Sequence, residues 1–275
     1  MSSDIQFAVG PDLAPPISQL PDEILCKIFS DAQEYDIFSR SSEMVRKFRS
    51  WLAVTHVCVR WRNAALACSA LWGRLITNAA GPEWLKAMTE RSKQCSISVR
   101  IDADVLEHEK AIRGMLLRPS RLRALRMYGG TASLQQALAL LKVPATQLEE
   151  LNIAFPSLMT PGKSIFPDNF LANHAPKLQR LTLTNCDFPW HPSPRFDNLT
   201  TLNITHYANS LHPPPLSRLQ VLLDALAEMP NLVELNLQQF AVHRARAQIQ
   251  PKFDARPQRQ AGGSRASSVR PISPA

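Results

Sequence analysis

The stretch Leu148-Glu-Glu-Leu-Asn-Ile153 is one copy of a short pattern, L-x-x-L-x-L, in which three apolar residues keep a fixed spacing. In an extended strand, alternate side chains point to the same face. The second and third apolar residues of a copy therefore point into a core, and the residue between them points to solvent. The pattern occurs five times, with its apolar residues at Leu122, Leu125 and Met127, at Leu148, Leu151 and Ile153, at Leu178, Leu181 and Leu183, at Leu199, Leu202 and Ile204, and at Leu232, Leu235 and Leu237.

The copies begin 26, 30, 21 and 33 residues apart, and leucine-rich repeats have a period of about 20–29 residues. Helical apolar stripes fill most of the gaps, as in residues 216–229, and residues 97–101 alternate like one more strand. Pro176 and Pro230 each stand two residues before a copy, where a proline ends a helix. Repeated helix-to-strand units in one direction predict an α/β protein whose parallel strands stack into a short, irregular leucine-rich-repeat solenoid.

Residues 20–75 have a helical pattern instead. Pro21 suits the first position of a helix, and Asp22 and Glu23 follow at the positive end of the helix dipole. Apolar residues with helical spacing then form one face of this helix and a second stripe further along the chain. The first face consists of Ile24, Leu25, Ile28 and Phe29, and the second stripe consists of Met44, Phe48, Trp51, Leu52, Val57, Trp61 and Ala65.

Three blocks of this region occur in the order typical of an F-box. They are Leu20-Pro-Asp-Glu-Ile-Leu-Cys-Lys-Ile-Phe29, then Val57-Cys-Val-Arg-Trp-Arg62, then Leu71-Trp72. The chain therefore resembles the F-box proteins. Phe29 and Val57 are 28 positions apart, which is wider than in compact F-boxes and is similar to the expanded F-box-like proteins of basidiomycete fungi.

The resemblance implies a non-catalytic substrate adaptor of an SCF-type cullin-RING ubiquitin ligase. Its N-terminal helices would bind the Skp-family subunit, and its repeats would bind a protein substrate. From periodicity alone, the same apolar residues fit the core of an unrelated helical cap equally well, and a leucine-rich scaffold unconnected with ubiquitination is the alternative function. The adaptor interface that the family implies consists of Leu20, Pro21, Ile24, Ile28 and Phe29, with Val57 and Trp61 supporting or joining it.

Within the repeats, the residues between the inward-pointing pairs are polar. They are expected to form one row on the concave side, with neighbours about 4.8 Å apart. Asparagine both donates and accepts hydrogen bonds, and the inner curves of solenoids are frequent binding surfaces. Because any solvated sheet face is polar, no single residue of the row indicates binding, and the prediction rests on all five residues together. The predicted substrate surface consists of Arg126, Asn152, Thr182, Asn203 and Asn236.

The net charge of +8 comes mostly from the segment after residue 241, which has seven basic residues and one acidic residue. The remainder is close to neutral, and the basic segment lacks interleaved aromatic residues, so the charge does not indicate nucleic-acid binding. We find no secretory signal and no apolar run long enough for a membrane span. Five scattered cysteines without a C-x-x-C pair favour a reducing compartment, the cytoplasm or the nucleus.

The predicted organisation is a flexible leader (1–17), a helical F-box domain (18–76), an irregular leucine-rich-repeat domain (77–241) and a disordered basic tail (242–275). Gly162-Lys163-Ser164 resembles the end of a P-loop, but Ser157 stands where a glycine is needed and Pro161 removes an amide donor. The histidines lack metal-ligand spacing, and no nucleophile motif is present. We therefore expect no enzymatic activity, cofactor or metal, and neither nucleic acid nor a membrane as a partner.

Overall fold

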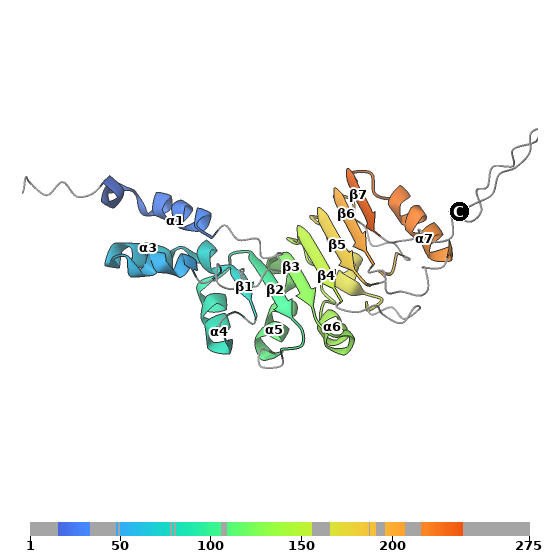
Figure 1. Cartoon of the computed structure of the whole chain (residues 1–275), viewed down its shortest axis with the longest axis horizontal. Coiled ribbons are helices and arrows are strands. Elements are labelled where there is room, and N and C mark those ends of the chain that lie inside the picture. Colours follow the sequence, from blue (N-terminus) through green and yellow to red (C-terminus); the bar gives the residue numbers. More distant parts are fainter. Residues whose placement is uncertain are drawn as a thin grey trace, which may run out of the picture. The chain divides into compact units, whose positions relative to one another are not determined.

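The computed structural model describes residues 16–33, 48, 50–77, 79, 81–105, 109–155, 166–186, 188–190, 196–206 and 216–238. It is a mixed α/β structure that begins with helices and continues as a parallel sheet (Figure 1). The leader up to residue 15, the Gly162–Ser164 segment and the basic tail from residue 242 lie outside the described residues.

The described N-terminal part is helical, with α-helices (α) and shorter 3-10 helices (η). Its elements are η1 (Pro16–Gln19), α1 (Asp22–Asp31), η2 (Trp51–His56), α3 (Val59–Ala67) and η3 (Ser69–Trp72).

The sheet and its connecting helices follow. The strands are β1 (Arg74–Ile76), β2 (Ile97–Asp102), β3 (Leu122–Tyr128), β4 (Glu150–Ala154), β5 (Arg180–Thr184), β6 (Thr201–Thr205) and β7 (Glu234–Gln238). The helices between them are α4 (Pro82–Arg91), α5 (Glu109–Leu116), η5 (Pro119–Arg121), α6 (Thr131–Leu138), η6 (Phe170–Asn173) and α7 (Leu216–Ala227).

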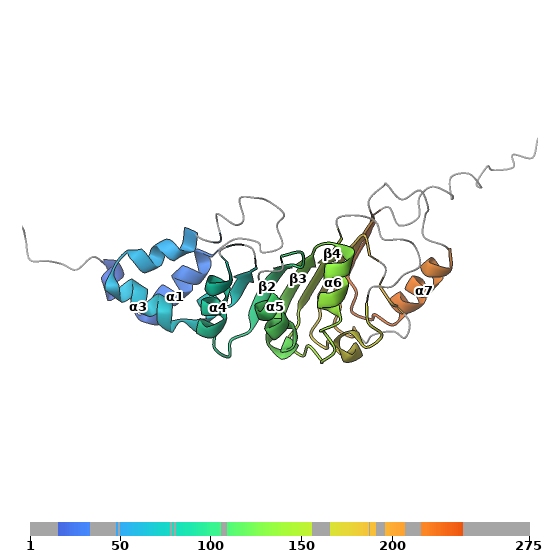
Figure 2. The same cartoon turned by 90° about the horizontal axis from the view of Figure 1, so that it is seen from below.

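The seven strands pair in the order in which they occur along the chain, and every pair is parallel. A parallel neighbour must be reached by a crossover connection. Helices α4, α5, α6 and α7 all lie on the same side of the sheet, and none of the described helices covers the opposite face, which we call the helix-free face (Figures 1 and 2). The predicted α/β class with parallel strands is therefore confirmed.

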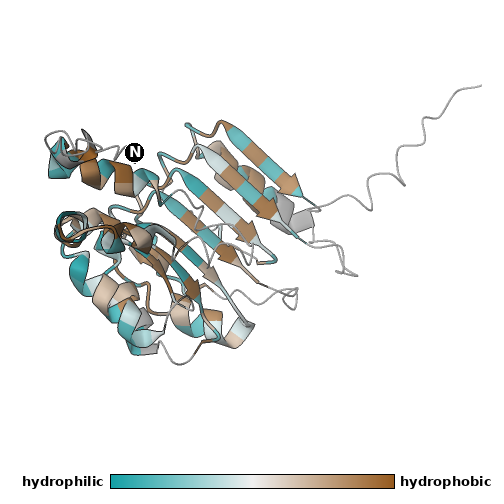
Figure 3. Cartoon of the chain, turned by 60° about the vertical axis from the view of Figure 1, so that its left-hand side comes forward, coloured by the Kyte–Doolittle hydropathy of each residue, from teal (hydrophilic) through white to brown (hydrophobic). Residues whose placement is uncertain are grey.

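The register explains why the repeated leucines decide this fold. Leu125, Leu151, Leu181 and Leu202 are successive partners across β3 to β6, and all four are buried. Apolar and polar residues alternate along these strands, as the banding in Figure 3 shows. Because alternation along a strand has period two, one register places every second residue in the core and the others on the helix-free face.

Strand β1 was not predicted. We expected a helical pattern as far as Leu75, but the helical part ends at Trp72, and Leu75 lies in β1, paired with Val99. A strand of three residues is too short to show a period of two. The strand expected at residues 97–101 is confirmed as β2.

Trp72 connects the helical part to the sheet. Its ring centroid lies 5.2 Å from that of Trp51 in η2 and 6.3 Å from that of Trp84 in α4. Its indole Nε1 donates a hydrogen bond of 2.9 Å to the carbonyl of Ala65 in α3. The buried apolar residues of the helices and of the sheet consequently form one continuous core.

None of the described helices is both long and apolar enough to cross a membrane.

Candidate protein-binding interface

Helix α1 has two apolar strips that differ in burial. Successive residues of an α-helix are rotated by about 100°, so residues four apart share a strip. Leu25 and Phe29 are both 0% exposed, whereas Ile24 is 44% and Ile28 is 39% exposed. One strip therefore belongs to the core, and the adjacent strip faces solvent.

Phe29, which the resemblance placed in the adaptor interface, is instead completely buried in the core. Its ring centroid lies 5.1 Å from that of Trp61 in α3, and Trp61 is itself half-buried. Spacing along the helix does not distinguish the two strips, since a helix that packs on a core has an apolar arc of 100° or more. Phe29 and Leu25 hold α1 against the rest of the helical part instead.

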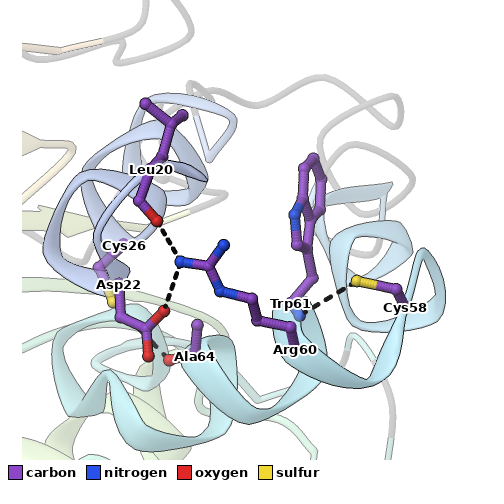
Figure 4. A network of polar contacts seen from close by, with 7 residues as sticks. All are labelled: Leu20, Asp22, Cys26, Cys58, Arg60, Trp61 and Ala64. Atoms are coloured by element: carbon purple, nitrogen blue, oxygen red, sulfur yellow. Dashed lines mark hydrogen bonds and ion pairs between the residues drawn. The ribbon is translucent and has the colours of Figure 1, made fainter. Parts of the chain in front are cut away.

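Polar contacts hold the start of α1 next to α3 (Figure 4). The Arg60 guanidinium donates to the carbonyl of Leu20 and lies 3.3 Å from the Asp22 carboxylate. An ion pair this close to the surface contributes only about 0–1 kcal/mol. Its main effect is therefore to orient the first turn of α1, where Pro21 occupies the N-cap position, one residue before the helical position that we predicted.

Two cysteines of this region have structural roles. Cys58 is the N-cap of α3, and its sulfur accepts a hydrogen bond of 3.5 Å from the backbone N–H of Trp61. The thiol of Cys26 donates to the carbonyl of Ala64 at 3.7 Å. Burial, together with a hydrogen bond and electrostatic repulsion from Cys68, raises the pKa of the Cys26 thiol to about 12. Cys26 is thus protonated at neutral pH and is a poor nucleophile.

The remaining predicted interface residues reach solvent to different degrees. Leu20 is half-buried, Pro21 is exposed, and Val57, two residues before α3, is 60% exposed. Pro21, Val57, Ile24 and Ile28 thus give the helical part several exposed apolar residues. Proteins use such surfaces for contacts with other proteins when the residues lie together.

Sequence reasoning missed Val59 and Leu66, both in α3 and both exposed. Val59 lies outside the stripe of Val57, Trp61 and Ala65 that we took as the apolar face of this segment. For Val59, the sequence did hold a sign of exposure, because this residue stands next to Arg60 and among other polar residues of α3.

Comparison with known proteins found one family match, which lies in this helical region. Residues 17–78 match a family model described as F-box-like. The chain carries an F-box-like domain. The matched segment contains all the exposed apolar residues described above, from Ile24 to Leu66. No curated protein matches the chain.

Beyond the F-box-like domain, the polar residues predicted to lie in one row are adjacent across the sheet. Arg126, Asn152, Thr182, Asn203 and Asn236 are successive register partners from β3 to β7. Asn152, Thr182 and Asn203 are half-buried, and Asn236 is exposed. These four residues therefore present amide and hydroxyl groups on the helix-free face.

The expected exposure of Arg126 was wrong, because its side chain is only 3% exposed. Its register partner Arg100 is also buried, with its guanidinium carbon 4.8 Å from the ring centroid of Tyr128. Alternation along a strand determines the face on which a side chain lies, but not whether other groups cover it. Arg126 thus stands in the row without contributing to its accessible surface.

Asn185, immediately after β5, is a structural residue that the pattern did not reveal. It is buried, has a φ of 54°, and its side-chain amide donates a hydrogen bond of 3.1 Å to the carbonyl of Phe155. Asparagine adopts this left-handed conformation more readily than most residues. The thiol of the next residue, Cys186, donates to the carbonyl of Ile153 at 3.9 Å. Both residues link the ends of neighbouring strands.

In the described part of the chain, no group of three or more His, Cys, Asp or Glu side chains is placed to hold a metal ion.

Proposed function

We propose that this protein is a substrate-recognition adaptor of an SCF-type cullin-RING ubiquitin ligase. Its F-box-like domain binds a Skp-family subunit, and the helix-free face of its sheet binds a protein substrate. The chain contributes no catalytic residue. It acts by holding the substrate close to the ubiquitin-conjugating enzyme, which raises the effective concentration of the substrate's lysines.

The observation that carries the proposal is the pair Ile24 and Ile28. They lie one turn apart on α1, inside the F-box-like domain, and both are more than a third exposed. Exposed valines at positions 57 and 59 add to the apolar surface of the same domain. A scaffold made only of repeats needs a polar end rather than such a face.

We also assign the sheet to the leucine-rich-repeat class. This assignment is supported by strands that pair in chain order, by leucines that are register partners, and by helices that gather on one side. In such proteins each unit contacts mainly its neighbours, and the open face is the usual binding surface. Asn152, Thr182 and Asn203 lie on that face and are the residues we assign to the substrate.

The proposed site of action is the cytoplasm, the nucleus or both. All five cysteines are free thiols. Unpaired cysteines are typical of proteins in reducing compartments. In such a compartment the protein would assemble with the cullin-RING ligase.

The test is co-purification with a recombinant Skp-family adaptor. The wild type should be retained by the immobilised adaptor, and Ile28→Asp should lose most of this binding, because a carboxylate would be buried without a partner at the interface. In the free protein the introduced carboxylate would remain in water, so the fold should survive. The matched control is Val143→Asp, which places the same charge at a position 48% exposed and outside the F-box-like domain.

Circular dichroism checks that each variant is folded. If folded Ile28→Asp binds the adaptor as well as the wild type does, the interface lies elsewhere on the domain. If the wild type itself does not bind, the alternative of a leucine-rich scaffold unconnected with ubiquitination is favoured.

A further inference from the structure

Within the described residues, the β7 end of the sheet is open. Among the described strands, β7 pairs only with β6. Leu235, the inward-pointing leucine of β7, is 44% exposed, whereas its register partner Leu202 in β6 is completely buried. The neighbouring Val233 is exposed as well. A core position has therefore been left partly uncovered at this end.

The β1 end shows how the same sheet is closed elsewhere. β1 has three residues, it contacts α4, and its Leu75 is completely buried. Natural edge strands are protected by being short, by a proline, a lysine or a bulge, or by a covering element. β7 is longer and has the sequence Glu-Leu-Asn-Leu-Gln, which contains neither proline nor lysine. Its pairing with β6 also shows no shift of register. β7 thus keeps its capacity to pair.

The hydrogen bonds show which backbone groups point to the open edge. The N–H of Glu234 donates to the carbonyl of Thr200, and the carbonyl of Gln238 accepts from the N–H of His206. In a parallel strand, alternate residues bond to opposite neighbours. Glu234, Asn236 and Gln238 therefore bond toward β6, and the N–H and C=O groups of Leu235 and Leu237 point to the open edge.

We propose that a second copy of this chain covers β7 by antiparallel pairing of the two β7 strands across a two-fold axis at Asn236. Leu235 then lies opposite Leu237 of the second copy, and the reverse pair forms at the same time. Each is a hydrogen-bonded pair, in which both backbone N–H groups donate to the carbonyl of the opposite residue. The pairing uses every backbone group that the two leucines present at the edge.

The charges of β7 fit this self-pairing. With the axis at Asn236, Glu234 faces Gln238 of the second copy, so no like charges meet across the strands. The two Asn236 residues form a pair without direct backbone bonds, with Cα atoms about 4.5 Å apart, and their side chains meet on the helix-free face. Leu235 and Leu237 of both copies cover one another on the helical side. The polar row then continues from one copy into the other.

The test is the molar mass of the full chain, measured by light scattering after size exclusion. The wild type should be a dimer. Asn236→Glu and Asn236→Lys should each weaken association by up to about fivefold, since like charges directly opposite each other destabilise a strand pair. An equimolar mixture of the two variants should recover the dimer, because opposite charges then meet at the axis. The matched control is Asn203→Glu, in the same row but inside the sheet, which should leave the dimer intact.

A second pair of variants tests the backbone directly. Leu235→Pro removes an N–H that points to the open edge, a change that edge strands tolerate, and should abolish the dimer. Leu235→Ala removes the same side chain but keeps the N–H, so more of the dimer should remain. A monomeric wild type overturns the proposal. If deletion of residues 242–275 then produces a dimer, that segment is what covers β7 in the full chain. Failure of the mixture to restore the dimer overturns the axis at Asn236 and with it the proposal. These readouts do not depend on binding of a Skp-family adaptor, so they can fail independently of the proposed function.

Discussion

Ile28 and Phe29 are adjacent in α1, yet Phe29 is completely buried beside Trp61, whereas Ile28 is 39% exposed. At the scale of single residues, this difference separates the two roles of the helix. Phe29 contributes to folding of the F-box-like domain. Ile28 leaves its apolar surface available for a partner, and the free energy of burying that surface is released only on binding.

We therefore expect truncations in the two strips to affect stability differently. Phe29→Ala should lower the free energy of unfolding by about 3–5 kcal/mol, because it creates a cavity against Trp61. Ile24→Ala, on the exposed strip, should change it by less than about 0.5 kcal/mol. Urea unfolding followed by circular dichroism measures both values. Equal losses would show that the two strips are equally buried in solution.

The raised pKa of Cys26 gives a second prediction at this scale. Alkylating reagents attack the thiolate, and a pKa of about 12 keeps Cys26 protonated at pH 8. Iodoacetamide should therefore label the exposed Cys58 much faster than Cys26 at pH 8, as mass spectrometry of the peptides would show. Unfolding in urea should remove the difference. Rapid labelling of Cys26 in the folded protein would contradict the raised pKa.

The same shift predicts how stability depends on pH. The pKa of Cys26 is raised from its ordinary value of 9.0 to about 12 in the folded protein. Between these values the unfolded state loses the proton more readily, so the unfolded state is favoured as pH rises. The contribution of Cys26 is accordingly complete below about pH 9 and decreases above it.

At the scale of elements, β2 to β7 were predictable from their apolar patterns, and β1 was not. β3 to β7 follow from the recurring leucines, and their register follows because a slip by one residue would expose every inward side chain. β1 was missed, since three residues carry no period. The burial of Arg126 depends on groups distant in sequence, which no local pattern records. The packing of α1 on α3 likewise determines which of the two apolar strips of α1 is buried, and no local pattern shows this.

The polar row gives the prediction at this scale. Asn152 and Asn203 flank Thr182 on the helix-free face, and replacing both by alanine should weaken recovery of the main substrate in a pull-down. Thermal stability and binding of the Skp-family adaptor should remain nearly unchanged, because neither side chain belongs to the apolar core. The matched control replaces the exposed Gln135 and Gln136 of α6, on the other side of the sheet. Substrate loss in the control but not in the test variant would move the site to the helices.

At the scale of the whole molecule, the helical part and the sheet meet at Trp72. Its ring packs edge-to-face with that of Trp51 and tilted against that of Trp84. The guanidinium of Arg91 lies 4.4 Å from its ring centroid, and Trp72 is fully buried. Gln33, just after α1, adds a hydrogen bond of 2.8 Å to the carbonyl of Leu71. Because these contacts join the helical part and the sheet in one core, a change that destabilises one of them should also destabilise the other.

Replacing Trp72 should therefore destabilise the F-box-like domain and the sheet together. Trp72→Ala should lower the free energy of unfolding by about 3–5 kcal/mol, whereas Trp72→Phe, which keeps an aromatic ring but leaves the Ala65 carbonyl without its donor, should cost about 1–3 kcal/mol. Hydrogen exchange should rise by a similar factor in α3 and in β2, because global unfolding controls exchange in both. Faster exchange confined to α3 would mean that the sheet is stable alone, and that the F-box-like domain is attached to it without sharing its stability.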